Sequence, residues 1–203
     1  LYWLSPNDKG LIGHKLQALP LAKDQPNKRP NTLPGLDNVY ALAASPDGRQ
    51  LALLRHFQWE HSDIYLYDIA EQQLQKVLSN HPFIQSLSWA RQGKQLMFAS
   101  ENQLNLFDIH SGISPLGFSS ENRIKEVHFS AHQERLLYVS DTGRYQLHSF
   151  ALKNPAALTP VAWGSSQNER NPAFSNDGKQ LAYISNRNGQ YQIWLTNAEG
   201  DNF

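Results

Sequence analysis

A tandem repeat of 40 to 45 residues constrains the fold of this chain more than any other feature. Four segments share one pattern, and they begin at residues 44, 89, 129 and 174. The clearest copies are Ala44–Leu53 and Phe174–Tyr183, in which Asp-Gly is followed by a basic residue and then Gln-Leu-Ala. The copies Trp89–Phe98 and Phe129–Tyr138 are more divergent. Four copies in one phase indicate that the chain is an array of one structural unit.

Each unit reads as a series of short β-strands. The Asp-Gly pair predicts a turn, because Asp caps the backbone and Gly adopts a positive φ. The apolar residues that follow are typical of an inner strand that is buried on both faces. A further strand of alternating type recurs downstream in every copy, at Ile64–Asp68, Leu104–Asp108, Leu147–Phe150 and Ile193–Asn197.

A period of this length with about four strands is typical of a β-propeller blade. We therefore predict an all-β fold, a β-propeller of about four-stranded blades. The repeats are expected over residues 38–82, 83–122, 123–164 and 165–203, the last of them incomplete. Propellers have about 4–8 blades, so a partial or open propeller is predicted. The alternative is a β-sandwich with fortuitous internal similarity.

Residues 1–37 are less regular, because they lack the turn of the repeat. Leu1–Ser5 resembles the third strand of a blade, and residues 13–21 could form the fourth. Four prolines then mark an extended, polar connection: Pro20, Pro26, Pro30 and Pro34. The segment is either the outer half of a blade or a linker that lies along the propeller.

Composition excludes several classes of function. The formal net charge is zero, with 18 Lys and Arg against 18 Asp and Glu, so we expect no binding of nucleic acid or of an anionic membrane surface by this segment. The absence of Cys excludes disulfides, thiolate metal sites and cysteine nucleophiles. No apolar run reaches the ~20 residues of a transmembrane helix, and no signal peptide is visible. We expect any anchor or export signal to lie outside these residues.

Motifs of catalysis and of cofactor binding are not found. Gly-x-Ser-x-Gly, Walker-type glycine loops and dinucleotide fingerprints are absent from the sequence. We therefore expect the chain not to be an enzyme by itself. We predict no catalytic, cofactor-binding or metal-binding residue and no cofactor.

The segment from His56 to His61 is the most unusual local cluster. Two imidazoles and Glu60 could bind zinc, but their spacing fits neither His-Glu-x-x-His nor His-x-x-Glu-His. The first repeat places 20 residues between Ala44 and Ile64, against 15 between Trp89 and Leu104. We interpret the longer connection as a candidate partner-binding loop formed by His56, Phe57, Trp59 and His61. The alternative is that its aromatic residues pack against a neighbouring blade.

Residues that recur in phase are expected to be structural, because one active site needs only one set of residues. The predicted turn residues of the repeat are Asp47, Gly48, Gly93, Asp177 and Gly178. Asp68 and Asp108 also recur in phase and are expected to cap turns. Charged residues near strand ends either line a channel or rim or form structural salt bridges; they are Arg55, Arg123, Glu126, Arg170 and Arg187.

The repeat resembles that of TolB-type propellers, whose pattern is Phe-Ser-Pro-Asp-Gly-Lys, Leu-Ala-Tyr and then Ile-Trp. The resemblance is specific in residues 171–200, good in 38–69, partial in 83–112 and weak in 123–152. The departures are Asn176 for Pro, Arg91-Gln92 for Pro-Asp and His132-Gln133 for Asp-Gly. They weaken the assignment of individual blades but not that of the fold.

The resemblance implies three settings for the domain. The segment Leu33–Tyr40, which leads into the first repeat, is similar to the start of the propeller in CadC- and ToxR-like membrane-bound transcriptional regulators. This similarity implies a non-catalytic sensor domain in the periplasm, tethered to the inner membrane, with the DNA-binding domain upstream. The alternatives are a TolB-like docking module of the cell envelope and the propeller cap of a prolyl oligopeptidase-like hydrolase.

The expected partner follows from the same resemblance. We expect a protein or a small signal molecule to bind, and no nucleic acid to bind to this segment. An open propeller would also expose unpaired strand edges, which favour self-association.

Overall fold

The structure is a computed structural model, and it describes residues 2–6, 14–18, 31–33, 35–58, 61–90, 93–130, 134–161 and 168–198. Strands and turns dominate these ranges, and they contain no α-helix. Nor do they contain a helix with the length and apolarity needed to cross a membrane. The prediction of an all-β chain is confirmed. The chain divides into two compact units, Leu1–Phe83 and Ile84–Phe203, which are described separately.

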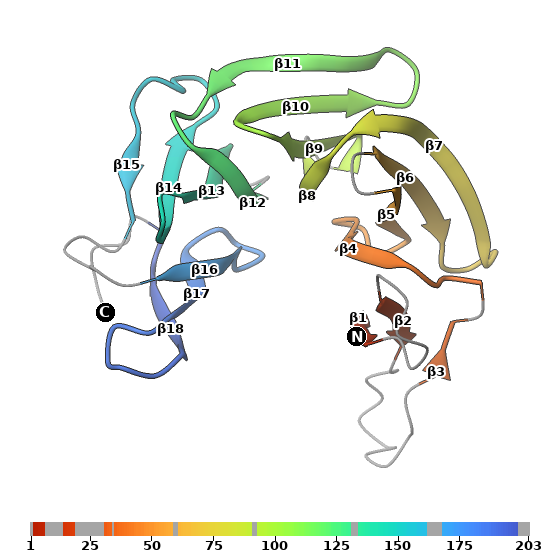
Figure 1. Cartoon of the computed structure of the whole chain (residues 1–203), viewed down its shortest axis with the longest axis horizontal. Coiled ribbons are helices and arrows are strands. Elements are labelled where there is room, and N and C mark those ends of the chain that lie inside the picture. Colours follow the sequence, from red (N-terminus) through yellow and green to blue (C-terminus); the bar gives the residue numbers. More distant parts are fainter. Residues whose placement is uncertain are drawn as a thin grey trace. The chain divides into compact units, whose positions relative to one another are not determined.

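The first unit is built on one antiparallel sheet, which we call sheet A (Figure 1). Its strand order is β1-β2-β4-β5-β6-β7, with β3 paired to β2. The strands are β1 (Tyr2–Pro6), β2 (His14–Ala18), β3 (Asn31–Thr32), β4 (Val39–Ala44), β5 (Gln50–Gln58), β6 (His61–Asp68) and β7 (Gln73–Pro82).

The second unit holds three sheets, each a meander of successive antiparallel strands (Figure 1). Sheet B is β8 (Ile84–Ala90), β9 (Gln95–Ser100), β10 (Gln103–Asp108) and β11 (Gly112–Ser119). Sheet C is β12 (Arg123–Ser130), β13 (Arg135–Asp141), β14 (Tyr145–Ala151) and β15 (Thr159–Pro160). Sheet D is β16 (Glu169–Phe174), β17 (Gln180–Ser185) and β18 (Gln192–Asn197).

Sheet C is apolar on both faces. Leu136 and Tyr138 on one face share a core with Met97 and other residues of sheet B. The alternate residues of the same strand, among them Leu137, share a second core with Leu181 and Tyr183 of sheet D. A two-layer sandwich buries only one face of each sheet. A stack of three sheets is therefore incompatible with the sandwich alternative.

Hydrogen bonds between inner strands join sheets B and C. The hydroxyl oxygen of Ser86 accepts a bond from the backbone N–H of Val127 at 3.0 Å. Two residues farther along β8, the oxygen of Ser88 accepts one from Phe129 N–H at 3.2 Å. Both bonds link β8 to β12, the first strands of the two sheets.

The N-terminal strands belong to the same sheet as the first repeat. β1 and β2 form an antiparallel pair, and His14 of β2 lies opposite Val39 of β4. Leu16 and Leu36 are buried against Leu51 and other residues of sheet A. One face of sheet A is thus covered by residues that precede the repeats.

The Asp-Gly turns of the first and last repeats have the same hydrogen bonds. In the first, Asp47 Oδ1 accepts bonds from the Ser45 hydroxyl at 2.6 Å and from Arg49 N–H at 3.0 Å. In the last, Asp177 Oδ1 accepts bonds from Ser175 at 2.6 Å and from Lys179 N–H at 3.1 Å. The glycines adopt positive φ, 70° at Gly48 and Gly178 and 81° at Gly93.

A second pair of aspartates closes the turns after β6 and β10. Asp68 Oδ1 accepts bonds from the N–H groups of Ala70 and Glu71, at 2.9 and 3.0 Å. Asp108 Oδ1 does the same for the two residues after Ile109, at 2.9 and 3.1 Å. These carboxylates take up backbone donors of the turns.

The turn aspartates predict a specific pH dependence of stability. Hydrogen bonds from Ser45 and Arg49 lower the pKa of Asp47, and those from Ser175 and Lys179 lower that of Asp177. A lowered folded-state pKa contributes stability that is present above the unfolded-state pKa and is lost as the pH falls through the folded-state pKa. We expect Asp47→Ala and Asp177→Ala to lower Tm at pH 7 and to lower it much less at about pH 2.

Thermal unfolding followed by circular dichroism across this pH range checks the prediction. The control is Asp37→Ala, since Asp37 is exposed and lies outside the turns. A Tm difference that stays the same at low pH would contradict the role assigned to the carboxylates.

Candidate functional site

Three aromatic rings meet at one end of sheet A, and we call them the aromatic end: Tyr40, His56 and Phe83. The Tyr40 and His56 rings are stacked with centroids 4.4 Å apart, and the Phe83 centroid lies 4.6 Å from that of His56. Tyr40 is on β4, His56 is on β5, and Phe83 directly follows β7. Tyr40 remains 43% exposed. The rings form a packed surface feature in contact with solvent.

The segment predicted as a loop is largely strand. His56 lies within β5 opposite Ser62, and Gln58 of the same strand pairs with His61. The prediction of a loop from His56 to His61 is therefore wrong, because the hydrogen-bonded ladder continues beyond the apolar part of the hairpin. Trp59 lies outside the described residues, as does the side chain of Phe57.

A buried carboxylate supports the strands beneath the aromatic end. Asp63 is 7% exposed, and it accepts bonds from Lys76 Nζ at 2.6 Å and from Asn80 N–H at 2.8 Å. Asn80 has a positive φ of 54°, so Asp63 holds an irregular point of β7. Burial acts to raise the pKa of Asp63, but these bonds outweigh it and the pKa is lowered.

Arg55 ties the same region to the chain before the first repeat. Its Nη2 donates to the carbonyl oxygen of Gly35 at 2.6 Å. Its guanidinium lies over the Tyr65 ring, 4.9 Å from the centroid, and Lys76 Nζ lies 5.3 Å from the same centroid. Cations over an aromatic ring are attracted to its face, so these contacts stabilise the strands that carry the aromatic end.

Metal binding finds no further support in the described part of the chain. No group of three or more His, Asp or Glu side chains there could hold a metal ion. His61 pairs with Pro82 in the strand ladder, and the His56 ring is stacked on Tyr40 and also contacts the tilted ring of Phe83.

A second polar cluster lies within sheet D. Arg187 Nη2 donates to Glu169 Oε1 at 3.0 Å and to the Tyr183 hydroxyl at 2.6 Å. The Arg187 guanidinium also lies over the Trp194 ring, 4.6 Å from its centroid. Glu169 and Tyr183 are buried, and burial raises the pKa of Tyr183 to about 12. A phenol that holds its proton at neutral pH is a hydrogen-bonding group here, not an acid or base.

The other charged residues near strand ends also have partners. Arg123 forms an exposed ion pair with Glu101 at 3.0 Å. Glu126 accepts a bond from the N–H of Asn171, and burial raises the pKa of this carboxyl group. Arg170 lies over the Tyr191 ring, 4.4 Å from its centroid. These contacts hold strands together and do not converge on one site.

Sequence reasoning missed two of the three rings of the aromatic end. Counting outward from the Asp47-Gly48 turn places position 40 near position 55, and an irregularity between Val39 and Ala41 shifts this pairing. That count could have found Tyr40. No local signal marks Phe83, which joins the cluster only because β7 returns to the same end of the sheet.

Comparison with known proteins shows the fold. No family model and no curated protein matches the sequence. The chain is similar to TolB from Acinetobacter baumannii, with a TM-score of 0.78 and 18% identity over 100% of this chain and 50% of that chain. It is similar to a putative TolB from Agrobacterium tumefaciens, with a TM-score of 0.73 and 19% identity over 93% and 72% of the two chains.

A WD-type propeller is also similar. The Cps50 (Swd1) β-propeller domain of Myceliophteria thermophila gives a TM-score of 0.54 and 13% identity over 78% of this chain and 55% of that chain. The chain therefore has a TolB-like β-propeller fold, and the fold prediction is confirmed. It spans half the length of the Acinetobacter protein, as a partial propeller does.

The cluster of Arg187 predicts a large loss of stability on substitution. Arg187→Met leaves the buried Glu169 carboxylate without its cation, and we expect the free energy of unfolding to fall by about 3–5 kcal/mol. The control is Arg123→Met, which breaks an exposed ion pair and should cost less than about 1 kcal/mol.

Urea unfolding of the two variants and the unsubstituted chain checks this prediction. Equal losses in the two variants would show that Arg187 is not a buried structural partner.

Proposed function

We propose that the chain is a non-catalytic protein-docking propeller whose partner binds at the aromatic end of sheet A. The observation that carries the proposal is the cluster of the Tyr40, His56 and Phe83 rings, in which Tyr40 stacks on His56 and remains 43% exposed. Large aromatic side chains are the residues that most often dominate the energy of protein interfaces.

The contacts around the rings indicate a rigid binding surface. The stacked rings and the bonds of Arg55 and Asp63 beneath them fix the surface before a partner arrives. A preorganised surface loses less conformational entropy on association. We include Phe57 and Trp59 in the proposal because they are the large aromatic residues next to His56 in the sequence.

The setting of this docking is part of the proposal. We place the domain in the periplasm, either as the sensor of a CadC-like membrane-tethered regulator or as a TolB-like docking module of the envelope. The likeness to two TolB structures supports docking at least as well as sensing. In both settings the bound partner is a protein, and this segment binds no nucleic acid.

The reading frame around these residues separates the settings. A winged helix and one apolar span of ~20 residues upstream would support the regulator. A cleavable signal peptide upstream would support envelope docking. A Gly-x-Ser-x-Gly segment downstream would instead favour the cap of a hydrolase.

Site-specific photo-crosslinking in intact cells tests the docking surface. We expect a benzophenone amino acid at position 40 to give one discrete adduct, identified by mass spectrometry, because a bound partner would cover Tyr40. The control is position 158 in the second unit, where Leu158 has a similar exposure of 45%. The same adducts at both positions, or none at position 40, would rule out docking at the aromatic end.

Phe57→Ala and Trp59→Ala separate binding from packing. If both side chains belong to the contact surface, each substitution should reduce the yield of the adduct at position 40 while Tm changes by only a few degrees. A collapse of Tm with no separate effect on the adduct would assign both side chains to the core.

A further inference from the structure

The turn between β17 and β18 carries the only Asn-Gly pair in the sequence, Asn188-Gly189. Both residues are exposed to solvent. Gly189 has a positive φ of 87°. Apart from its chain neighbours, a Cβ atom built there would have no heavy atom within 4 Å. Because glycine has no side chain, the backbone nitrogen of Gly189 is sterically open to the side chain of Asn188.

Asparagine is a chemically labile residue, and one that precedes glycine can lose its amide without an enzyme. The backbone nitrogen of Gly189 would attack Cγ of Asn188 and form a new N–C bond, which closes a succinimide ring. The bond between Cγ and the amide nitrogen breaks, and ammonia leaves with the proton from the Gly189 nitrogen. Water then adds to either ring carbonyl group and opens the ring. The products are aspartate and isoaspartate, and in isoaspartate the chain runs through the former side chain.

The side chain of Asn188 is available for this reaction. Its amide has no hydrogen-bond partner in the described part of the chain. Asn186, in the same turn, differs, because its Oδ1 accepts a bond from the N–H of Asn168 at 2.9 Å. In the corresponding turn of sheet B, Asn102 Nδ2 donates to the carbonyl oxygen of Ser120 at 3.0 Å. Arginine and glutamine follow these two asparagines, so the backbone nitrogens after them are also less open to attack.

The two Asp-Gly turns contain the same glycine, but their acidic side chains are held. Asp47 and Asp177 each accept bonds from a serine hydroxyl and a backbone N–H. Their lowered pKa keeps both ionised at neutral pH, and a carboxylate is a poorer electrophile than an amide.

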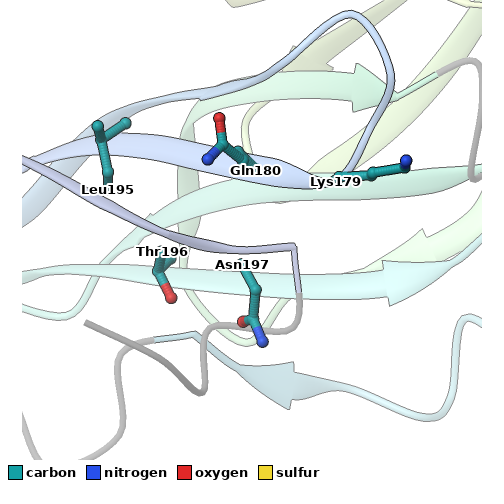
Figure 2. A pocket seen from close by; sticks show the side chains of 5 residues that line it. All are labelled: Lys179, Gln180, Leu195, Thr196 and Asn197. Atoms are coloured by element: carbon teal, nitrogen blue, oxygen red, sulfur yellow. The ribbon is translucent and has the colours of Figure 1, made fainter.

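Burial does not explain the protection of these aspartates. Both are exposed, and a hollow of about 390 Å³ lies at the same end of sheet D as Asp177 (Figure 2). The hollow is lined by Lys179, Gln180, Leu195, Thr196 and Asn197. Hydrogen bonding and ionisation therefore distinguish Asp47 and Asp177 from Asn188.

One hydrogen bond of the turn opposes the reaction. The N–H of Gly189 donates to the carbonyl oxygen of Asn186 at 2.8 Å, and this bond must break before the nitrogen can attack. The turn is an exposed connection between two strands, where local opening costs little free energy. The folded chain should therefore react more slowly than the unfolded chain, but at a measurable rate.

We propose that Asn188 is a site of spontaneous deamidation whose isoaspartate product weakens the ion pair of Arg187. Arg187 directly precedes Asn188, and its Nη2 donates to Glu169 at 3.0 Å and to Tyr183 at 2.6 Å. Isoaspartate lengthens the backbone of the turn by one carbon atom, which changes the path of the chain next to this guanidinium. The proposal involves no partner and is independent of docking at the aromatic end.

Peptide mapping by mass spectrometry tests the proposal on the folded chain, after incubation at mildly alkaline pH. We expect the mass gain of an amide-to-acid conversion in the segment that contains Asn188, and methylation of that segment by an isoaspartyl methyltransferase. Asn102 and Asn186 are internal controls and should keep their amides. The control variant is Asn188→Gln, because its longer side chain closes a ring far more slowly, and it should show no mass gain there.

Thermal unfolding tests the effect on the ion pair. The isoaspartate form, separated from the unmodified chain by ion exchange, should have a Tm lower by at least ~2 °C. Asn188→Asp adds the same charge to a normal backbone and should lower Tm less.

Three results would overturn the proposal. One is an Asn188 that stays intact in the folded chain after the urea-unfolded chain has been converted. Another is equal conversion at Asn102, which would mean that the Asn188 turn is not selective. The third is an isoaspartate form with the same Tm as the unmodified chain or as Asn188→Asp, which would mean that the backbone of this turn does not control the ion pair of Arg187.

Discussion

The structure depends on sheets that bury both of their faces. Sheet C carries Leu136 on one side and Leu137 on the other, and each lies in a different core. Such a sheet is stable only with a neighbour on each side, since exposing one face would return a row of large apolar side chains to water. The tandem repeat supplies these neighbours, because each copy provides antiparallel strands of the same pattern to one sheet.

The same constraint applies to the outer faces of sheets A and D. In sheet A, the chain before the first repeat covers Leu51 and Leu53 with Leu16 and Leu36. In sheet D, Ile193 and Leu195 are 76% and 62% exposed. Sheets A and D thus differ in how far one face is buried.

Sequence reasoning worked best where a single turn decides the structure. The bonds of Asp47 and Asp177 span two residues, so the spacing of Ser, Asp and Gly specifies them. Sequence reasoning failed where the structure depends on strand pairing between residues that are farther apart in the sequence. The ladder between His56 and Ser62 continues through polar residues that carry no strand signal. The ring of Phe83 reaches His56 only through the return of β7. The sequence left two interpretations of Arg187, a channel or rim residue and a structural salt bridge. The burial of its ion pair with Glu169 favours the salt bridge.

The hydroxyls of Ser86 and Ser88 have a consequence for how such a domain can diverge. They fix the position of the β12 backbone relative to β8 along the strand direction. Sheets B and C are therefore held against sliding along their strands by groups within the strands. Loops at the blade ends can then gain or lose residues without shifting the adjacent blade. The binding surface on one blade can therefore change while the adjacent blade keeps its position, and such a fold can acquire new binding specificities.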